Sequence, residues 1–172
     1  KNDYIKCSDL SINDALYFMR NDLQLSYIQE QILIGKMLGD GSLNGNSINF
    51  NHKKDHEEYL DYTLQSLGEL AGNKQKEQIS QYGTLMVRAR TLSTLAVGNL
   101  FSDWFIGEVK QVPKSIIGKL TPISLAFWYM DDGSLSHHND QEDRACFATC
   151  GFNEESINNL VLAFNCLNIK AT

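Results

Sequence analysis

The chain has 172 residues, of which 42% are hydrophobic and 21% are charged, and its formal net charge at pH 7 is −6. These proportions are those of a globular protein and exclude a wholly disordered chain. No apolar run is long enough to span a membrane, and Lys1 to Asp9 lack the apolar stretch of a secretion signal. The cysteines show no paired metal or disulfide spacing, which favours a reduced, intracellular setting.

The charge is unevenly distributed along the chain. Residues 73–120 contain seven Lys or Arg and three acidic residues, although the whole chain is acidic. Because salt confines the field of a charged patch to about 10 Å, a local basic surface can still attract phosphate. The negative net charge therefore does not exclude a nucleic-acid partner.

The N-terminal part contains one short helical pattern and one strong one. Residues 12–19 have a weak helical pattern within an expected N-terminal appendage, residues 1–25. Ser26 and Gln29 then form a capping-box pattern before an apolar run that stops at Gly39-Asp40-Gly41. We predict a buried helix that ends in an acidic residue.

The next segment alternates between extended and helical patterns. Ser42 to Asn51 is polar and is typical of a strand or hairpin arm with one wet face. Asp55 to Leu70 has a helical apolar period, and Gly72 is the expected end of that helix. Lys74 to Tyr82 and Thr84 to Arg90 flank Gly83 and predict a hairpin.

The C-terminal part repeats the order of the first. A helix is predicted from about Leu92 to Phe105, and a second one begins at Pro122, which suits a first helical turn. This second helix is apolar and ends at Asp131-Asp132-Gly133. Ser134 to Thr149 has strand character around a polar loop, and Glu154 to Leu167 is a final helix.

Both apolar helices therefore end in an acid followed by Gly-Ser-Leu. A single Asp-Gly is most often a turn, but two copies in the same context indicate an internal repeat. If the two helices pack side by side, Asp40 and Asp132 come together and repel each other unless a cation lies between them. Such a carboxylate pair suits Mg²⁺ and phosphodiester cleavage.

The residues Leu33–Gly41 and Leu125–Gly133 resemble the two signature motifs of the LAGLIDADG homing endonucleases. The stretch Leu120–Gly133 is typical of the monomeric, two-motif, intron-encoded members. The resemblance runs from about Tyr27 to the end of the chain. It implies an α+β fold of two pseudo-twofold, αββαββα-like halves, with the motif helices at their interface and antiparallel, saddle-shaped sheets for DNA. We expect residues 26–120 to form the first half and residues 121–172 a second, truncated half.

The resemblance also implies roles for residues at matching positions. Asp40 and Asp132 match the catalytic acids, and Gly39 and Asp131 would offer backbone carbonyls to the metal. Lys110 precedes Pro113 as the family's catalytic lysine precedes a proline; the alternative is a solvated loop lysine. The implied cofactor is Mg²⁺, with Mn²⁺ or Ca²⁺ able to substitute in binding.

Candidate DNA contacts follow from strand alternation. Arg88 and Arg90 share one strand face, a spacing that suits guanine edges or phosphates. Asn49 also loosely matches a polar residue that orders solvent. His52 and His56 stand four residues apart without a third ligand and are interpreted as surface histidines. The full candidate set is Asn44, Asn46, Asn49, Asn51, Lys53, Lys74, Lys76, Gln78, Ser80, Arg88, Arg90 and Arg144.

The sequence therefore predicts a site-specific homing endonuclease that makes a staggered, Mg²⁺-dependent double-strand break in a long DNA target. The alternative is a non-cleaving protein on the same scaffold, either an intron-splicing maturase that binds intron RNA or a DNA-binding regulator. Two retained, mutually repelling acids favour cleavage; an intein-embedded form is disfavoured because Lys1 is not a splicing nucleophile. We expect a monomer, or a chain paired with one that supplies a missing C-terminal segment. No membrane partner is expected, and the setting is an organelle or a bacterial or phage cytoplasm.

Overall fold

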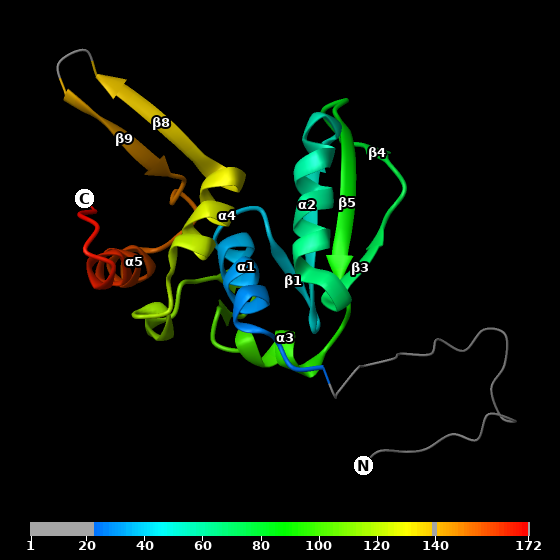
Figure 1. The fold of residues 1–172 in the computed structure, drawn as a ribbon, viewed down its shortest axis with the longest axis horizontal. Coiled ribbons are helices and arrows are strands. Elements are labelled where there is room, and N and C mark those ends of the chain that lie inside the picture. The colour runs from blue at the N-terminus through cyan, green and yellow to red at the C-terminus, as the bar shows by residue number, and fades with distance from the viewer. Residues whose placement is uncertain (1–22, 139–140, 172) are drawn as a thin grey trace, which may run out of the picture.

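The structure of the chain, a computed structural model, describes residues 23–138 and 141–171 (Figure 1). The helical pattern expected at residues 12–19 lies outside these ranges. Within them, no helix is both long enough and apolar enough to cross a membrane.

Helices and antiparallel strands are mixed along the chain, which confirms the expected α+β class. The helices are α1 (Tyr27–Leu38), α2 (Glu57–Leu67), α3 (Leu95–Leu100), α4 (Pro122–Asp132) and α5 (Glu154–Cys166). The strands are β1 (Ser42–Asn44), β2 (Ser47–Lys53), β3 (Ala71–Lys74), β4 (Gln78–Ile79), β5 (Leu85–Thr91), β6 (Phe105–Ile106), β7 (Val109–Lys110), β8 (Gly133–His138) and β9 (Gln141–Phe147). Short 3₁₀ turns occupy Lys54–His56, Gly68–Leu70 and Lys114–Ile116.

The two apolar helices both start with a capping box. At α1, the Gln29 main-chain N–H donates to Ser26 Oγ at 3.2 Å, and Gln29 Oε1 accepts from the Ser26 N–H at 2.8 Å. At α4, Ser124 Oγ accepts from the Thr121 N–H at 2.8 Å, and the Ser124 N–H donates to Thr121 Oγ1 at 3.4 Å. These bonds satisfy donors that a helix start otherwise leaves open, so they fix where each helix begins.

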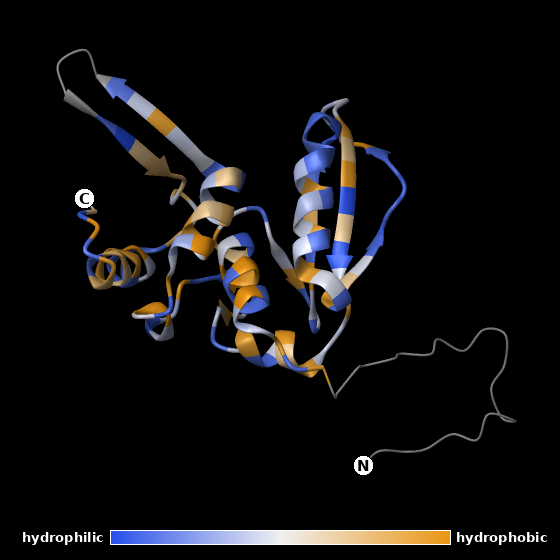
Figure 2. Cartoon of the chain, viewed as in Figure 1, coloured by the Kyte–Doolittle hydropathy of each residue, from blue (hydrophilic) through white to orange (hydrophobic). Residues whose placement is uncertain are grey.

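Helices α1 and α4 lie side by side at the centre of the molecule (Figure 1), and α1 carries orange, hydrophobic positions among polar ones (Figure 2). Ile32, Leu33 and Met37 of α1 are at most 1% exposed. At Gly35 the helices approach so closely that an added Cβ would overlap the Ser124 carbonyl oxygen and lie 2.8 Å from Phe127 Cβ. The glycine therefore sets the distance between the two acid-bearing helices.

Gly35→Ala is expected to destabilise the protein. Alanine normally favours a helix interior by ~1 kcal/mol over glycine, but here its methyl group meets backbone. We expect the free energy of unfolding to fall by ~1–3 kcal/mol, the usual cost of overpacking. Urea unfolding measures it, with Gly151→Ala as the control because nothing lies within 4 Å of a Cβ there. A more stable Gly35→Ala protein would contradict the close packing.

A five-stranded antiparallel sheet follows α1, in the order β1-β2-β5-β3 with β4 also paired to β5. Along β2, Ile48, Phe50 and His52 are buried, whereas Asn49 and Asn51 point to the other face. Strand β5 alternates in the same way (Figure 2), and α2 packs on the inner face of the sheet. One face is thus apolar and covered, and the other is polar.

Three element boundaries differ from the sequence prediction. Helix α2 ends at Leu67 because Gly68 adopts a positive φ of 55°; Gly72 lies in β3 instead. The helix expected over residues 92–105 covers only α3 and is followed by the β6–β7 hairpin. Trp104 is buried as expected, but it lies in a turn and not on a helix face. The hairpin arm expected over residues 74–82 is divided between β3 and β4.

Helix α4 leads directly into the β8–β9 hairpin, which projects away from the helix pair (Figure 1). Trp128 of α4 packs on Phe147 of β9 and Phe164 of α5, with ring centroids 4.3 and 6.1 Å away. Helix α5 is also tied to the preceding loop, since Ser156 Oγ accepts from the Val112 N–H at 2.9 Å. Aromatic packing around Trp128 therefore holds α4, β9 and α5 together.

Candidate active site at the junction of α1 and α4

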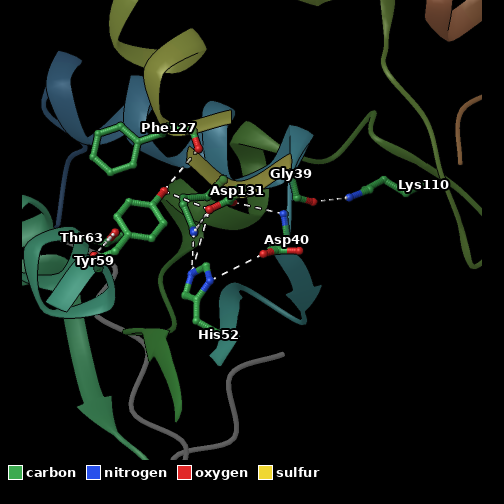
Figure 3. Close-up of polar contacts among 9 residues, drawn as sticks. Gly39, Asp40, His52, Tyr59, Thr63, Lys110, Phe127 and Asp131 are labelled. Carbon is green, nitrogen blue, oxygen red and sulfur yellow. Dashed lines mark hydrogen bonds and ion pairs between the residues drawn. The ribbon is translucent and has the colours of Figure 1, made fainter. Parts of the chain in front are cut away.

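The acidic ends of the two apolar helices meet. The Asp40 main-chain N–H donates to Asp131 Oδ2 at 3.1 Å, which links the end of α1 to the last turn of α4 (Figure 3). A Cβ on Gly39 would lie 2.5 Å from Asp131 Cβ, so only glycine fits at this approach. The two copies of the sequence repeat therefore lie next to each other in space, where the ends of α1 and α4 meet.

The Asp131 carboxylate is buried in a polar cluster. Its side chain is fully buried, its Oδ1 lies 2.5 Å from Lys36 Nζ, and the Tyr59 hydroxyl donates to Oδ1 at 2.9 Å. Burial raises the pKa of Asp131 and lowers the pKa of Lys36, while each charge opposes the shift of the other. The carboxylate thus joins α4 to α1 and α2; a metal-binding role for the Asp131 carbonyl stays a prediction.

His52 is part of the same cluster, and its interpretation as a surface histidine is wrong. Its side chain is 4% exposed, with Nε2 2.9 Å from Lys36 Nζ and Nδ1 3.6 Å from Asp40 Oδ2 (Figure 3). Burial, then the Lys36 charge, lowers the pKa of His52 to about 4. His56 is exposed, as expected. The sequence signal for its inward position is strand alternation, because His52 follows Ile48 and Phe50 at every second residue.

Asp40 is the accessible acid of the junction. Its side chain is 41% exposed. Partial burial, followed by the charges of Asp131 and Asp132, raises the pKa of Asp40 to about 6 against the pull of Lys36 and Lys110. Asp132 is half-buried in the last turn of α4, and its charge reaches Asp40. The carboxylates predicted as a pair thus interact electrostatically.

Lys110 lies at the same junction, carried by β7. Its ammonium donates to the main-chain carbonyl of Gly39 at 3.1 Å (Figure 3). It also donates to the carbonyl of Met37 at 2.9 Å and lies 3.5 Å from that of Gly41. Burial lowers the pKa of Lys110, and Asp132 is the first charge to oppose this. Lys110 is therefore not a solvated loop lysine; its catalytic role stays a prediction.

Several side chains at the junction of α1 and α4 carry atoms that can ligate a divalent metal ion. The Asp40 and Asp132 carboxylates are hard oxygen donors, the type that Mg²⁺ prefers. Ligand atoms of Asp40, His52 and Asp131 also lie within 4.8 Å of one another. The Lys36 ammonium already contacts both Asp131 and His52, and a metal-binding role for Asp40 together with Asp132 stays a prediction.

The polar face of the five-stranded sheet carries half of the twelve candidate DNA contacts. Cross-strand pairing puts Asn49 beside Arg90 and Asn51 beside Arg88. Gln78 of β4 accepts from Arg88 Nη1 at 2.5 Å. A depression of about 270 Å³ on this face is lined by Asn44, Asn49, Asn51, Gln75, Arg88, Ala89 and Arg90. Asn49 thus lies on the face of β2 opposite to His52.

The expectation that Lys74 shares this face is wrong. Lys74 pairs with Ala89, whose side chain points inward. Its ammonium donates to Glu57 at 2.7 Å and Asp61 at 2.8 Å, both on α2. Continuous alternation from Lys74 to Ser80 fails because β3 ends at Lys74 and β4 starts only at Gln78.

The remaining candidates are dispersed. Lys53 is exposed at the end of β2, and Lys76 is exposed between β3 and β4. Ser80 Oγ accepts from the Thr84 N–H at 3.1 Å and so stabilises a turn. Asn46 lies in the β1–β2 turn against Gly98, and Arg144 lies opposite Ser136 in the separate β8–β9 hairpin.

Several known proteins are similar to this chain in sequence. RecA from Mycolicibacterium flavescens is 30% identical over 121 residues, covering 66% of this chain and 27% of that protein. Cytochrome b mRNA maturase bI2 from Saccharomyces cerevisiae is 32% identical over 125 residues, covering 59% of this chain and 29% of the maturase. DNA endonuclease I-ChuI from Chlamydomonas applanata is 29% identical over 136 residues, covering 68% of this chain and 62% of I-ChuI. The chain thus spans less than a third of the length of this RecA and of this maturase.

A solved structure has the same fold. The homing endonuclease I-WcaI bound to its DNA recognition sequence superposes with a TM-score of 0.68 and 26% sequence identity, covering 83% of this chain and 68% of that one. Residues 30–172, which include both acid-bearing helix ends, match the LAGLIDADG DNA endonuclease family. With both motif helices, their joined acidic ends and the antiparallel sheet in place, the chain belongs to the LAGLIDADG DNA endonuclease family.

Proposed function

We propose that this chain acts as a site-specific DNA endonuclease that hydrolyses phosphodiester bonds with Mg²⁺ and makes a staggered double-strand break, as in intron homing. The observation that carries the proposal is the junction of the two helix ends, where partial burial and then the charges of Asp131 and Asp132 raise the pKa of Asp40. Mutually repelling carboxylates lower stability, and a metal-dependent reaction gives a reason to keep them.

Asp40 and Asp132 would hold the ion, which supplies stabilisation of the charge on the scissile phosphate and a more acidic water. With a pKa of about 6, Asp40 is mainly ionised at neutral pH and can act as a ligand or accept a proton. The Lys110 ammonium lies against the carbonyls of Met37 and Gly39, where a cation can stabilise developing phosphate charge.

The polar face of the sheet would hold the DNA. Arg88 and Arg90 stand on alternate positions of β5, with asparagines beside them on β2. Arginine suits guanine edges and phosphates, and asparagine suits adenine edges. I-WcaI, the structural relative, is bound to DNA. We propose that the chain divides into two halves at residues 120/121. We also propose that it acts as a monomer or is completed by another segment, and that it works in an organelle or in a bacterial or phage cytoplasm.

The second candidate is a maturase-type protein that binds intron RNA without cleaving DNA. The observation that favours it is the similarity to cytochrome b mRNA maturase bI2. Arg88 and Arg90 of β5 would then contact RNA phosphates, and Asp40 and Asp132 would not take part in catalysis. Binding to structured intron RNA in place of duplex DNA would support this second reading.

The test is selection from a randomised duplex DNA library in Ca²⁺, followed by addition of Mg²⁺. The proposal predicts enrichment of one sequence in Ca²⁺ and defined breaks within it after Mg²⁺ is added. The double variant Asp40→Asn/Asp132→Asn is the control and should enrich the same sequence without cutting it. Enrichment without cleavage by the unaltered chain would contradict the endonuclease proposal.

A further inference from the structure

A chain of four polar side chains runs from the interior of the molecule to Asp40. Asp131 Oδ1 lies 2.5 Å from Lys36 Nζ, and Lys36 Nζ lies 2.9 Å from His52 Nε2. His52 Nδ1 in turn lies 3.6 Å from Asp40 Oδ2. Asp131, Lys36 and His52 have side chains that are at most 4% exposed, so solvent does not replace these contacts.

Donor and acceptor capacities fix the direction of this chain. An ammonium group has three donors and no acceptor, so the contact with Lys36 requires an unprotonated His52 Nε2. A neutral imidazole carries its single proton on one nitrogen, which must then be Nδ1. That N–H faces the Asp40 carboxylate at a distance that can shorten to a hydrogen bond when substrate binds.

We propose that Lys36 holds His52 in its Nδ1–H tautomer, so that His52 donates toward Asp40 as a positioning residue and does not ligate metal. This inference rests on the proposed function of Asp40. It also explains why a lysine is fully buried within the apolar helix α1. The Lys36 ammonium lies over the rings of Phe50 and Tyr59, at 5.4 and 4.7 Å from their centroids, and these contacts limit its possible positions.

The same contacts explain why the cluster of Asp40, His52 and Asp131 does not serve as a three-ligand metal site. A metal bound through His52 Nε2 or Asp131 Oδ1 would compete with Lys36 directly, and one bound through His52 Nδ1 would require the ring proton on Nε2, which faces the Lys36 ammonium. The buried ammonium is thus a fixed cation in that position. It leaves Asp40 Oδ2 as the group whose orientation His52 controls.

The tautomer is measured directly by long-range ¹⁵N–¹H correlation of the imidazole rings in the metal-free, DNA-free protein. The spectrum of His52→Gln identifies the His52 signals among the four histidines. At pH 7 we expect His52 to be neutral, with the proton on Nδ1. A His52 protonated on Nε2, or on both nitrogens, would overturn the proposal, whatever the outcome of any cleavage assay.

Two lysine variants test the role of Lys36. Lys36→Met removes the donor and should shift His52 toward the Nε2–H tautomer. Lys110→Met is the matched control, since this second buried lysine bonds to main-chain carbonyls of Met37 and Gly39, and should leave the tautomer unchanged. Equal changes in both variants would overturn the assignment. If Lys36→Met does not fold, the wild-type spectrum decides.

The positioning role is tested by single-turnover cleavage at saturating DNA. The amide nitrogen of asparagine can replace Nδ1–H, so His52→Asn should retain most of the rate. His52→Leu, which has no donor, should cut about 10- to 100-fold more slowly, the usual loss for a group supporting a metal ligand. Equal rates for these two variants, with the wild-type affinity for DNA, would contradict a donor role.

Discussion

Asp40→Asn is expected to abolish detectable cleavage while making the metal-free protein more stable. The amide keeps the size of the side chain but removes the charge that holds a cation and accepts a proton. Loss of one charge-stabilising group from an active site reduces rates on the order of 10²- to 10³-fold. DNA binding in Ca²⁺ should persist, because the sheet residues proposed to contact DNA are unchanged.

The gain in stability follows from the pKa of Asp40. The folded protein holds this proton up to about pH 6, whereas the ordinary value is 3.8. Ionisation of Asp40 therefore lowers the free energy of unfolding progressively between about pH 4 and pH 6, and the full cost is present above pH 6. Because the side chain is 41% exposed, solvent screening reduces this cost to on the order of 1 kcal/mol.

Urea unfolding without metal at pH 7 and pH 4 measures the effect. Asp40→Asn should exceed the wild type at pH 7, and the difference should shrink at pH 4. Glu69→Gln, which removes an exposed acid outside the junction, is the control and should change little at either pH. An Asp40→Asn protein less stable than wild type at pH 7 would mean that the ionised carboxylate stabilises the fold.

Arg90→Ala is expected to weaken DNA binding strongly, whereas Lys74→Ala is expected to leave it nearly unchanged. Both substitutions remove one positive charge from the same sheet, but the two side chains lie on opposite faces. Arg90 is exposed in the depression on the polar face, and Lys74 is paired with Glu57 and Asp61 of α2. Loss of a good arginine contact costs ~1–3 kcal/mol in binding.

Equilibrium binding to the selected DNA over a range of salt concentrations measures this difference. If Arg90 contacts phosphate, the slope of log affinity against log salt should also decrease by ~0.9 for Arg90→Ala. The slope for Lys74→Ala should remain that of the wild type. Equal losses for both variants would show that net charge, rather than the polar sheet face, attracts the DNA.

The elements that hold the site could be predicted because local signals agree with tertiary packing. Ser26 and Thr121 start helices α1 and α4 through capping boxes, and continuous apolar runs bury both helices. The repeated acid at the end of each run then located Asp40 and Asp132. Here propensity, capping and burial all favour the same structure.

The polar cluster behind Asp40 could not be found in the same way. Lys36 lies in the middle of an apolar run, and a buried lysine is rare unless it is paired. Its partner Asp131 is distant in sequence and was assigned only a backbone role. His52 was compared with His56 at helical spacing, although its strand neighbours Ile48 and Phe50 indicate an inward position. Long-range pairing of charges leaves no periodic signal.

Strand register limited the prediction of DNA contacts. Lys74 and Gln78 have the even spacing that would place them on one face of a continuous strand. The break between β3 and β4 reverses the direction of Lys74, so that its ammonium reaches α2. Breaks of this kind depend on pairing with β5 and are not visible in the sequence of the arm itself.

Strand-resolved cleavage kinetics on the selected DNA target most directly test whether Asp40 and Asp132 form one composite catalytic site. Each strand is labelled separately, and wild type, Asp40→Asn and Asp132→Asn are compared in Mg²⁺. We expect the wild type to cut both strands at a fixed offset and each single variant to lose that double-strand break while still binding in Ca²⁺. A variant that cuts both strands at the wild-type rate would contradict a site that needs both carboxylates.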